Sequence, residues 1–217
     1  MRFIFFALVL WYSGMAMPAS VDVVIVTSAS ENRTYAGQSF AGITVSPRRP
    51  VKRAVELALY ESATLFDTLG IDSSISELQL DTSGDIAQQL GSIKPNSLVI
   101  LDLPIDNFEP IARAADQLKL VSVNVRHSDS YLRESLCLSQ LFHTIPSDNM
   151  YFDALGQFLV YRGWRKVLVI KGPTQRDNER AVALVASLKK FGASIADERT
   201  FILSHHPDDR DRNRPDF

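Results

Sequence analysis

The stretch that decides the fold covers residues 21–27 and reads Val-Asp-Val-Val-Ile-Val-Thr, a nearly continuous series of β-branched residues. A parallel strand has this pattern when both of its faces are buried, whereas a strand with one solvent-exposed face alternates apolar and polar residues. The opening strand therefore predicts an α/β fold in which helices cover both faces of a parallel sheet.

The residues that follow continue this pattern. A polar segment over residues 28–50 is predicted to be a loop, after which apolar residues recur at helical spacing over residues 51–66. Further strands are predicted over residues 75–80, 98–103, 120–125 and 141–144, and helices over residues 85–90 and 109–118. This alternation predicts a Rossmann-like parallel sheet with right-handed crossovers.

The rest of the chain predicts the start of a second α/β lobe. Helices over residues 148–162 and 178–191 alternate with strands over residues 167–170 and 195–203. Pro146 separates the two series, so we predict an N-terminal lobe over residues 20–145 and a second lobe over residues 146–217. Because two strands and two helices cannot cover both faces of a parallel sheet, we expect the second lobe to be incomplete.

The first nineteen residues have the parts of a secretory signal peptide. Arg2 precedes an apolar run over residues 3–12, and small residues suited to cleavage after Ala16 or Ala19 follow it. The alternative is a membrane anchor, but this run is shorter than the roughly 20 residues that span a bilayer. We therefore predict a signal peptide over residues 1–19, export, and no stable membrane insertion after cleavage.

Composition argues against a nucleic-acid-binding protein and against a protein built on disulfides or on zinc sites with paired cysteines. Lys and Arg together number 23 against 25 Asp and Glu, a formal net charge of −2, so the chain lacks the positive field of a nucleic-acid-binding protein. The one cysteine, Cys137, permits neither an internal disulfide nor a zinc site built on paired thiolates. A lone cysteine is usually a small core residue, and we assign Cys137 no chemistry.

Three segments around the lobe boundary resemble a known family. Leu141-Phe-His-Thr-Ile-Pro-Ser-Asp148 leads into a helix that ends in Tyr161-Arg-Gly-Trp164, and the next strand ends in Lys171-Gly-Pro173. Together they resemble the crossover between the lobes of type 1 periplasmic binding proteins of the branched-chain amino-acid (leucine-binding) class.

Further segments narrow the resemblance: His143-Thr-Ile-Pro-Ser147, Tyr131-Leu-Arg-Glu-Ser-Leu-Cys137 and Asp208-Asp-Arg-Asp-Arg-Asn213. They are similar to segments of ABC-transporter substrate-binding proteins encoded with PQQ-dependent alcohol dehydrogenase systems. The resemblance covers roughly the first half to two-thirds of the family's length. It implies a periplasmic protein that binds a small polar solute, amino-acid-like or a carboxylate, between two lobes for an ABC permease, with no cofactor and no turnover.

The strand ends of the predicted sheet supply the candidate binding residues. Ligands of parallel sheets bind at the carboxyl ends of the strands, so we expect Pro104, Asn124, Arg126 and Ser128 to face the solute. The Arg126 guanidinium suits a bidentate carboxylate contact, and the Ser128 hydroxyl suits a further hydrogen bond. The alternative is a solvated loop in which Arg126 pairs with Asp129.

Candidates in the second lobe each have a structural alternative. Tyr151 either forms an aromatic wall against the solute or packs as a helix residue. Asp148 is interpreted as structural, because a carboxylate at a helix start accepts amide hydrogen bonds and complements the helix dipole. His205 and His206, with the acidic residues after them, are interpreted as a solvated tail rather than a metal site.

The sequence holds no nucleophile elbow, no Walker-type loop and no Gly-x-Gly-x-x-Gly fingerprint. We therefore predict no catalytic and no metal-binding residues. Two other interpretations stay open: a small exported α/β hydrolase that uses His127 with Asp102 or Asp106, and an interaction module or non-binding gene fragment.

Overall fold

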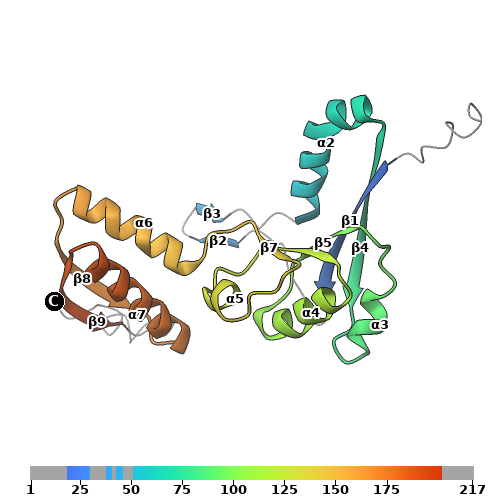
Figure 1. The fold of residues 1–217 in the computed structure, drawn as a ribbon. Helices are drawn as coiled ribbons and strands as arrows, with labels where there is room; N and C mark the ends of the chain where they lie inside the picture. The colour runs from blue at the N-terminus through green and yellow to red at the C-terminus, as the bar shows by residue number, and fades with distance from the viewer. Residues whose placement is uncertain (1–18, 30–37, 41–42, 46–50, 202–217) are drawn as a thin grey trace, which may run out of the picture. The chain divides into compact units, whose positions relative to one another are not determined.

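The computed structural model describes residues 19–29, 38–40, 43–45 and 51–201, which form two compact units (Figure 1). The first unit combines the described residues up to Arg126 with Leu138–Thr144, and the second combines His127–Cys137 with the described residues from Ile145 onward. The predicted boundary after residue 145 lies beside one of the places where the chain passes between units, and the lobe assignment stays a prediction. The predicted signal peptide lies outside the described residues except for Ala19.

The first unit is built on a five-stranded sheet. Its strands are β1 (Ala19–Ser28), β4 (Ile71–Leu80), β5 (Leu98–Leu101), β6 (Val121–Asn124) and β7 (Leu141–His143). They pair in the order β4-β1-β5-β6-β7, and every pairing is parallel. Because β1 lies inside the sheet, the crossovers leave it in both directions, as in doubly wound sheets. This order confirms the predicted Rossmann-like α/β fold.

Helices cover both faces of this sheet. On one face α2 (Val51–Leu69) packs Val55 against Val23 and Ile25 of β1. Successive strand residues point to opposite faces, so Val24 and Val26 lie on the other one. The right-handed crossovers through α3 (Ile86–Leu90) and α4 (Ile105–Gln117) run in the opposite direction to the one through α2, which places them over that face.

Helix α4 begins earlier than the sequence predicted. Pro104 is its extended N-cap residue, and Ile105 and Asp106 form its first turn instead of a loop. The prediction began this helix at Glu109, whereas α4 begins at Ile105 and contains Pro110. Pro110 is exposed, and the fully buried Phe108 and Ile111 anchor the turns on either side of it. Tertiary burial therefore outweighs the local cost of the proline.

The predicted loop over residues 28–50 contains a short antiparallel hairpin. Strand β2 (Gln38–Phe40) pairs with β3 (Ile43–Val45), with Ser39 opposite Thr44. Strands of three residues are too short for an alternating pattern to be read, which is why the sequence did not predict them.

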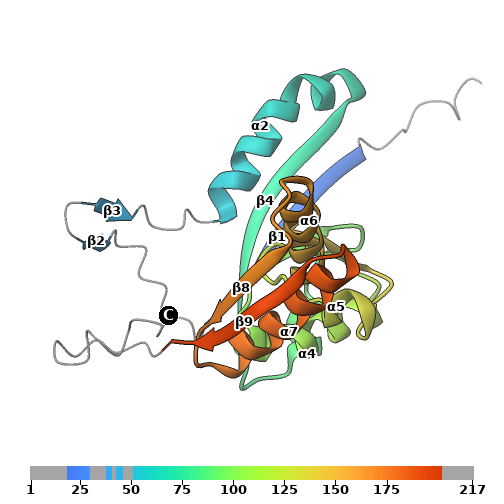
Figure 2. The same ribbon diagram turned by 90° about the vertical axis from the view of Figure 1, so that its left-hand side faces the viewer.

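The second unit contains a two-stranded parallel sheet and three helices among its described residues. These elements are α5 (Tyr131–Glu134), α6 (Asp148–Tyr161), β8 (Lys166–Lys171), α7 (Gln175–Lys190) and β9 (Ser194–Thr200). Figure 2 shows β8 and β9 side by side, and their register shifts between Val167 and Leu168. Val169 of β8 packs with Leu188 of α7 in a small core to which α6 also contributes.

The other face of this small sheet is uncovered among the described residues. Leu168 and Ile170 are 39% and 44% exposed, although the neighbouring Val169 is buried at 3%. Apolar strand residues normally pack under a helix or a second sheet. The described part of the second unit is therefore a partial lobe. Nowhere in the described ranges is a helix both long enough and apolar enough to cross a membrane.

Candidate functional site

Buried polar side chains mark the carboxyl edge of the first sheet. Ser28 ends β1, Asp102 follows β5 and Asn124 ends β6, and their exposed fractions are 2%, 4% and 0%. The Asp102 amide donates to the Val26 carbonyl at 3.0 Å, and the Asn107 carboxamide lies 3.5 Å from the Ser28 hydroxyl. Buried polar groups are stable only when hydrogen-bonded, so the strand ends are fixed by this polar layer.

Asn124 fixes the loop that carries Arg126. Its Oδ1 accepts a hydrogen bond from the Arg126 amide at 3.0 Å, and its Nδ2 lies 3.0 Å from His143 Nδ1. Arg126 is half-buried just beyond the end of β6. The predicted site residues Asn124 and Arg126 are thus in contact. Asn124 is buried, so it contributes by binding the Arg126 backbone amide and not by facing solvent.

Pro104 lies at the next strand end, after β5. Its backbone has φ −60° and ψ 154°, so it turns the chain from the strand into α4. The side chain is half-buried, and no hydrogen bond from a side chain caps α4 at this point. Pro104 therefore shapes the edge of the sheet, and a solute contact at this residue stays a prediction.

In the second unit, Ser128 and Asp148 bind each other. The Ser128 hydroxyl donates to Asp148 Oδ1 at 3.0 Å, and the Asp148 amide donates to the Ser128 carbonyl at 2.6 Å. Arg180 of α7 lies 3.2 Å from the same carboxylate oxygen. Asp148 is 6% exposed, so these partners supply the charge and hydrogen bonds that a buried carboxylate needs. The Ser128 hydroxyl therefore already donates its proton to the Asp148 carboxylate.

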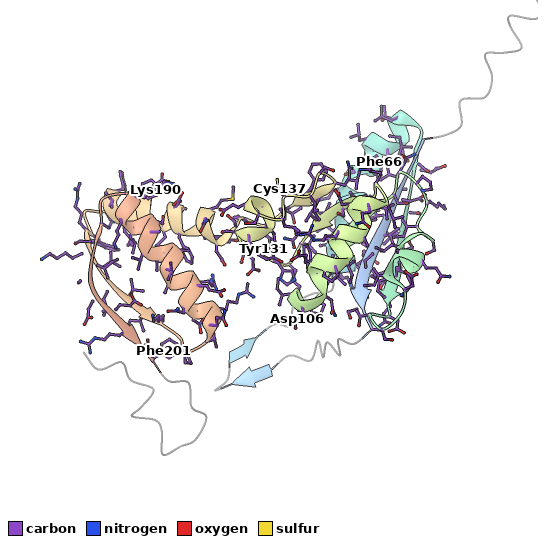
Figure 3. All side chains as sticks on the ribbon, turned by 60° about the horizontal axis from the view of Figure 1, so that its bottom comes forward. Phe66, Asp106, Tyr131, Cys137, Lys190 and Phe201 are labelled. Carbon is purple, nitrogen blue, oxygen red and sulfur yellow. The ribbon has the colours of Figure 1, made fainter. Side chains whose placement is uncertain are left out.

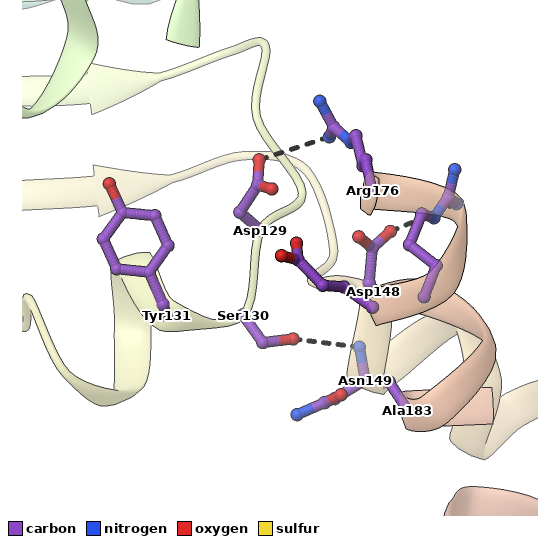
Figure 4. Close-up of a pocket in the computed structure, with 9 residues that line it drawn as sticks. Asp129, Ser130, Tyr131, Asp148, Asn149, Arg176 and Ala183 are labelled. Atoms are coloured by element: carbon purple, nitrogen blue, oxygen red, sulfur yellow. Dashed lines mark hydrogen bonds and ion pairs between the residues drawn. The ribbon is translucent and has the colours of Figure 1, made fainter. Parts of the chain in front are cut away.

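A second ion pair lies beside this one in a shallow pocket of about 160 Å³. Asp129 Oδ2 lies 3.2 Å from Arg176 of α7, and the Ser130 hydroxyl accepts from the Asn149 amide at 3.1 Å (Figure 4). Asp129 is the residue that the alternative interpretation paired with Arg126. Two acid–base pairs of this pocket, Asp129 with Arg176 and Asp148 with Arg180, already oppose each other's charge. Glu179 also lines the pocket and accepts from the Gln175 carboxamide at 2.9 Å.

A second cavity, of about 290 Å³, lies at the carboxyl end of β8. Phe152, Leu184 and Phe201 line it, and the Arg180 guanidinium lies 5.8 Å from the centre of the Phe152 ring. Asp177 stands at its edge, where the Thr174 hydroxyl and then the Thr174 amide lower the pKa of this carboxyl. The wall of this cavity is largely apolar, and the Arg180 guanidinium beside it already pairs with Asp148.

Tyr151 projects from the first turn of α6. Ser147 caps this helix by accepting from the Met150 amide at 3.3 Å, which fixes where the turn begins. The Tyr151 side chain is 50% exposed, so part of its ring is open to contacts. Its role as an aromatic wall stays a prediction.

Three other expectations have different outcomes. Cys137 is exposed (Figure 3), so its prediction as a small core residue is wrong. It lies three residues after the end of α5, with a backbone φ of +38°. His127 is buried, and its Nδ1 lies 4.0 Å from Asp129 Oδ2. His205 and His206 lie outside the described residues, and the described ones contain no cluster suited to a metal ion.

Sequence reasoning missed some residues of the carboxyl edge. Ser28, Asn107 and His143 join the polar layer, yet none was named as a candidate. A usable signal existed for Ser28 and His143, because each is a polar residue at the end of a strand. For Asn107 the prediction had no means of placing the residue, because it took this part of α4 for a loop.

Solved structures of known proteins share this fold. The ABC transporter substrate-binding protein from Desulfitobacterium hafniense has a TM-score of 0.62 at 19% identity, over 89% of this chain and 53% of that chain. A branched-chain amino acid ABC transporter periplasmic ligand-binding protein from Burkholderia xenovorans LB400 has a TM-score of 0.63 at 13% identity, over 85% and 47%. The chain has the type 1 periplasmic binding protein fold.

A third structure with the type 1 periplasmic binding protein fold is the ABC transporter solute-binding protein from R. palustris in complex with benzoate. Its TM-score is 0.53 at 13% identity, over 89% of this chain and 51% of that chain. The chain spans about half the length of these three structures. No family model matches the sequence, and no curated protein matches it. The expected fold is confirmed, and the hydrolase alternative gains no support.

Proposed function

We propose that the chain belongs to a periplasmic solute-binding protein of an ABC importer and recognises a small solute that carries a carboxylate. The observation that carries this proposal is the polar carboxyl edge of the first sheet, at which Asn124 holds the backbone of Arg126. Ligands of doubly wound sheets bind at this edge, and arginine is the side chain best suited to a bidentate carboxylate contact.

The ligands of proteins with this fold support the solute class. The Desulfitobacterium hafniense protein was solved in complex with Leu, and the R. palustris protein with benzoate. Both molecules combine a carboxylate with an apolar body. In the proposed site Arg126 binds the carboxylate, and Pro104 and Asn124 shape the strand ends around it. Ser128 and Tyr151 are proposed as solute contacts from the second unit.

The cellular setting completes the proposal. Residues 1–19 act as a signal peptide, and the mature protein works in the periplasm with an ABC permease. Its solute comes from the substrates or products of a PQQ-dependent alcohol dehydrogenase system. The protein binds without turnover and without a cofactor. The proposed lobes cover residues 20–145 and residues 146–217, and they differ from the two compact units in that segment His127–Cys137 belongs to the second unit.

Titration calorimetry tests this proposal with leucine, benzoate and the carboxylates that arise from alcohol oxidation. We expect at least one of them to bind, and we expect Arg126→Ala to weaken its binding about tenfold or more, because a charge-assisted hydrogen bond contributes roughly 1.5–3 kcal/mol. The matched control is Arg113→Ala. Arg113 is an exposed arginine of α4 that pairs with Glu109 at 2.7 Å, so its loss should leave the affinity unchanged.

Two results would contradict the proposal. Equal effects of Arg126→Ala and Arg113→Ala would show that the solute does not use the carboxyl edge. Hydrolysis of an ester in place of simple binding would favour the enzyme interpretation.

A further inference from the structure

We propose that His143 is a positioning residue that holds the backbone of Arg126 through the side chain of Asn124. Its effect on solute binding rests on the proposed function, whereas its effect on the Arg126 backbone does not. His143 ends β7, one of the two edge strands of the described sheet, and is the direct partner of Asn124 in the parallel pairing of β6 with β7.

The contact with the Arg126 amide determines the orientation of the Asn124 carboxamide. The Arg126 amide is a donor, so the atom that lies 3.0 Å from it must be the acceptor Oδ1 and not Nδ2. This contact settles which way the carboxamide faces. The Nδ2 group therefore points toward His143.

The other end of the carboxamide determines the state of the imidazole. The Asn124 Nδ2 lies 3.0 Å from His143 Nδ1, and an amide NH₂ group donates but does not accept. Nδ1 must therefore be the acceptor, which requires a neutral ring with its proton on Nε2. A ring protonated at Nδ1 would set two donors against each other at this distance.

The backbone of Asn124 is already fixed. Its carbonyl accepts from both the amide and the hydroxyl of Thr144, each at 3.2 Å. With the main chain fixed in this way, the Arg126 amide and His143 each contact one end of the Asn124 carboxamide.

Asn124 acts on Arg126 from the interior of the protein. Asn124 has an exposed fraction of 0%, whereas Arg126 is half-buried and reaches the surface of the carboxyl edge. A solute from solvent therefore contacts Arg126, and Asn124 supports Arg126 through the hydrogen bond to its backbone amide. Without an acceptor at Nδ1, the carboxamide gains freedom to rotate, and the Arg126 amide loses a fixed partner.

Long-range ¹H–¹⁵N NMR of the unaltered chain tests the imidazole state directly at neutral pH. We expect the His143 resonances of a neutral ring, with Nε2 protonated and Nδ1 bare. A proton on Nδ1 would overturn the proposal, because the Asn124 contact would then have two donors.

Two variants test the positioning role. His143→Leu removes the acceptor, whereas His143→Asn keeps a side-chain oxygen as far from the backbone as Nδ1. We expect hydrogen exchange of the Arg126 amide to become roughly tenfold faster in His143→Leu, the change expected from losing one ordinary hydrogen bond, and to return close to its original rate in His143→Asn. The control is Phe142→Leu, because Phe142 is 58% exposed and adjacent on β7.

The outcomes separate this inference from the proposed function. An Arg126 amide that exchanges equally in all four proteins would overturn the positioning role. If exchange follows the expected order, a carboxylate that binds the unaltered chain should bind His143→Leu more weakly and His143→Asn normally. If exchange follows that order but no carboxylate binds the unaltered chain, the positioning role holds and the proposed function fails.

Discussion

At the scale of single residues, Asp148 shows how one side chain organises the second unit. Its carboxylate binds the Ser128 hydroxyl and the Arg180 guanidinium, and its amide binds the Ser128 carbonyl. The sequence suggested a structural role from its place at a helix start. The structure adds that Asp148 ties segment His127–Cys137 to α6 and α7, because Ser128 lies in that segment and Arg180 on α7.

Asp153 makes the stability of the second unit depend on pH. The Lys190 ammonium at 2.6 Å and the Ser187 hydroxyl at 2.5 Å, both on α7, hold the pKa of this α6 carboxyl below its ordinary value. A lowered folded pKa stabilises the folded state above the unfolded pKa of about 4, and this contribution is lost as the pH falls through the folded value. We expect the free energy of unfolding to fall less steeply below about pH 4 in Asp153→Asn than in the unaltered chain.

Urea unfolding followed by circular dichroism at several pH values measures this difference. Asp67→Asn is the charge-matched control, because Asp67 is an exposed carboxylate of α2. An equal change in slope for both variants would show that the effect comes from net charge and not from the contact between α6 and α7.

At the scale of elements, the start of α7 is set by a capping box. The Thr174 hydroxyl accepts from the Asp177 amide at 3.1 Å and donates to the Asp177 carboxylate at 2.6 Å. Loss of such a cap costs about 1 kcal/mol. We therefore expect Thr174→Ala to lower the free energy of unfolding by about that amount and Thr174→Ser to restore it.

Chemical denaturation of the three proteins checks this prediction. The sequence placed the start of this helix at residue 178, and if α7 truly began there, Thr174→Ala would have no effect. The result therefore distinguishes the two boundaries.

The elements that sequence predicts well are those whose pattern is long. Strand β1 has ten residues and helix α2 has nineteen, each with a regular apolar pattern, and both lie where they were expected. The hairpin of β2 and β3 has three residues a strand, and the start of α4 depends on the burial of Phe108, so neither could be read from local pattern. Local spacing predicts an element, but tertiary burial decides its end.

At the scale of the whole molecule, the sequence predicted a candidate site at the carboxyl edge of the sheet but not the contacts that support its residues. Strand ends of a parallel sheet meet at one edge, so Asn124 and Arg126 were expected at the same edge. The contact between Asn124 and His143 joins residues 19 apart in sequence and depends on the pairing of β6 with β7. No spacing rule predicts such a pair, because it requires the order of the strands.

The two units differ in how well their strands are covered. Residues 23–26 of β1 have exposed fractions of 0–8% and neighbours on both sides, whereas β8 pairs with β9 alone among the described strands and has exposed apolar residues on one face. Hydrogen exchange should therefore be slower at residues 23–26 than at residues 167–170. Equal protection would mean that another strand or another copy of the chain covers β8.

The central claim is that a carboxylate solute is recognised at the carboxyl edge of the first sheet. A ¹H–¹⁵N NMR titration of the chain with leucine and benzoate tests it most directly, because each backbone amide reports its own surroundings. The account predicts that shifts concentrate at Leu103, Arg126 and Ser128, after the strands, and leave Asp22 and Lys94 at the amino ends unchanged. Shifts confined to Asp22 and Lys94, or spread evenly over the chain, would contradict it.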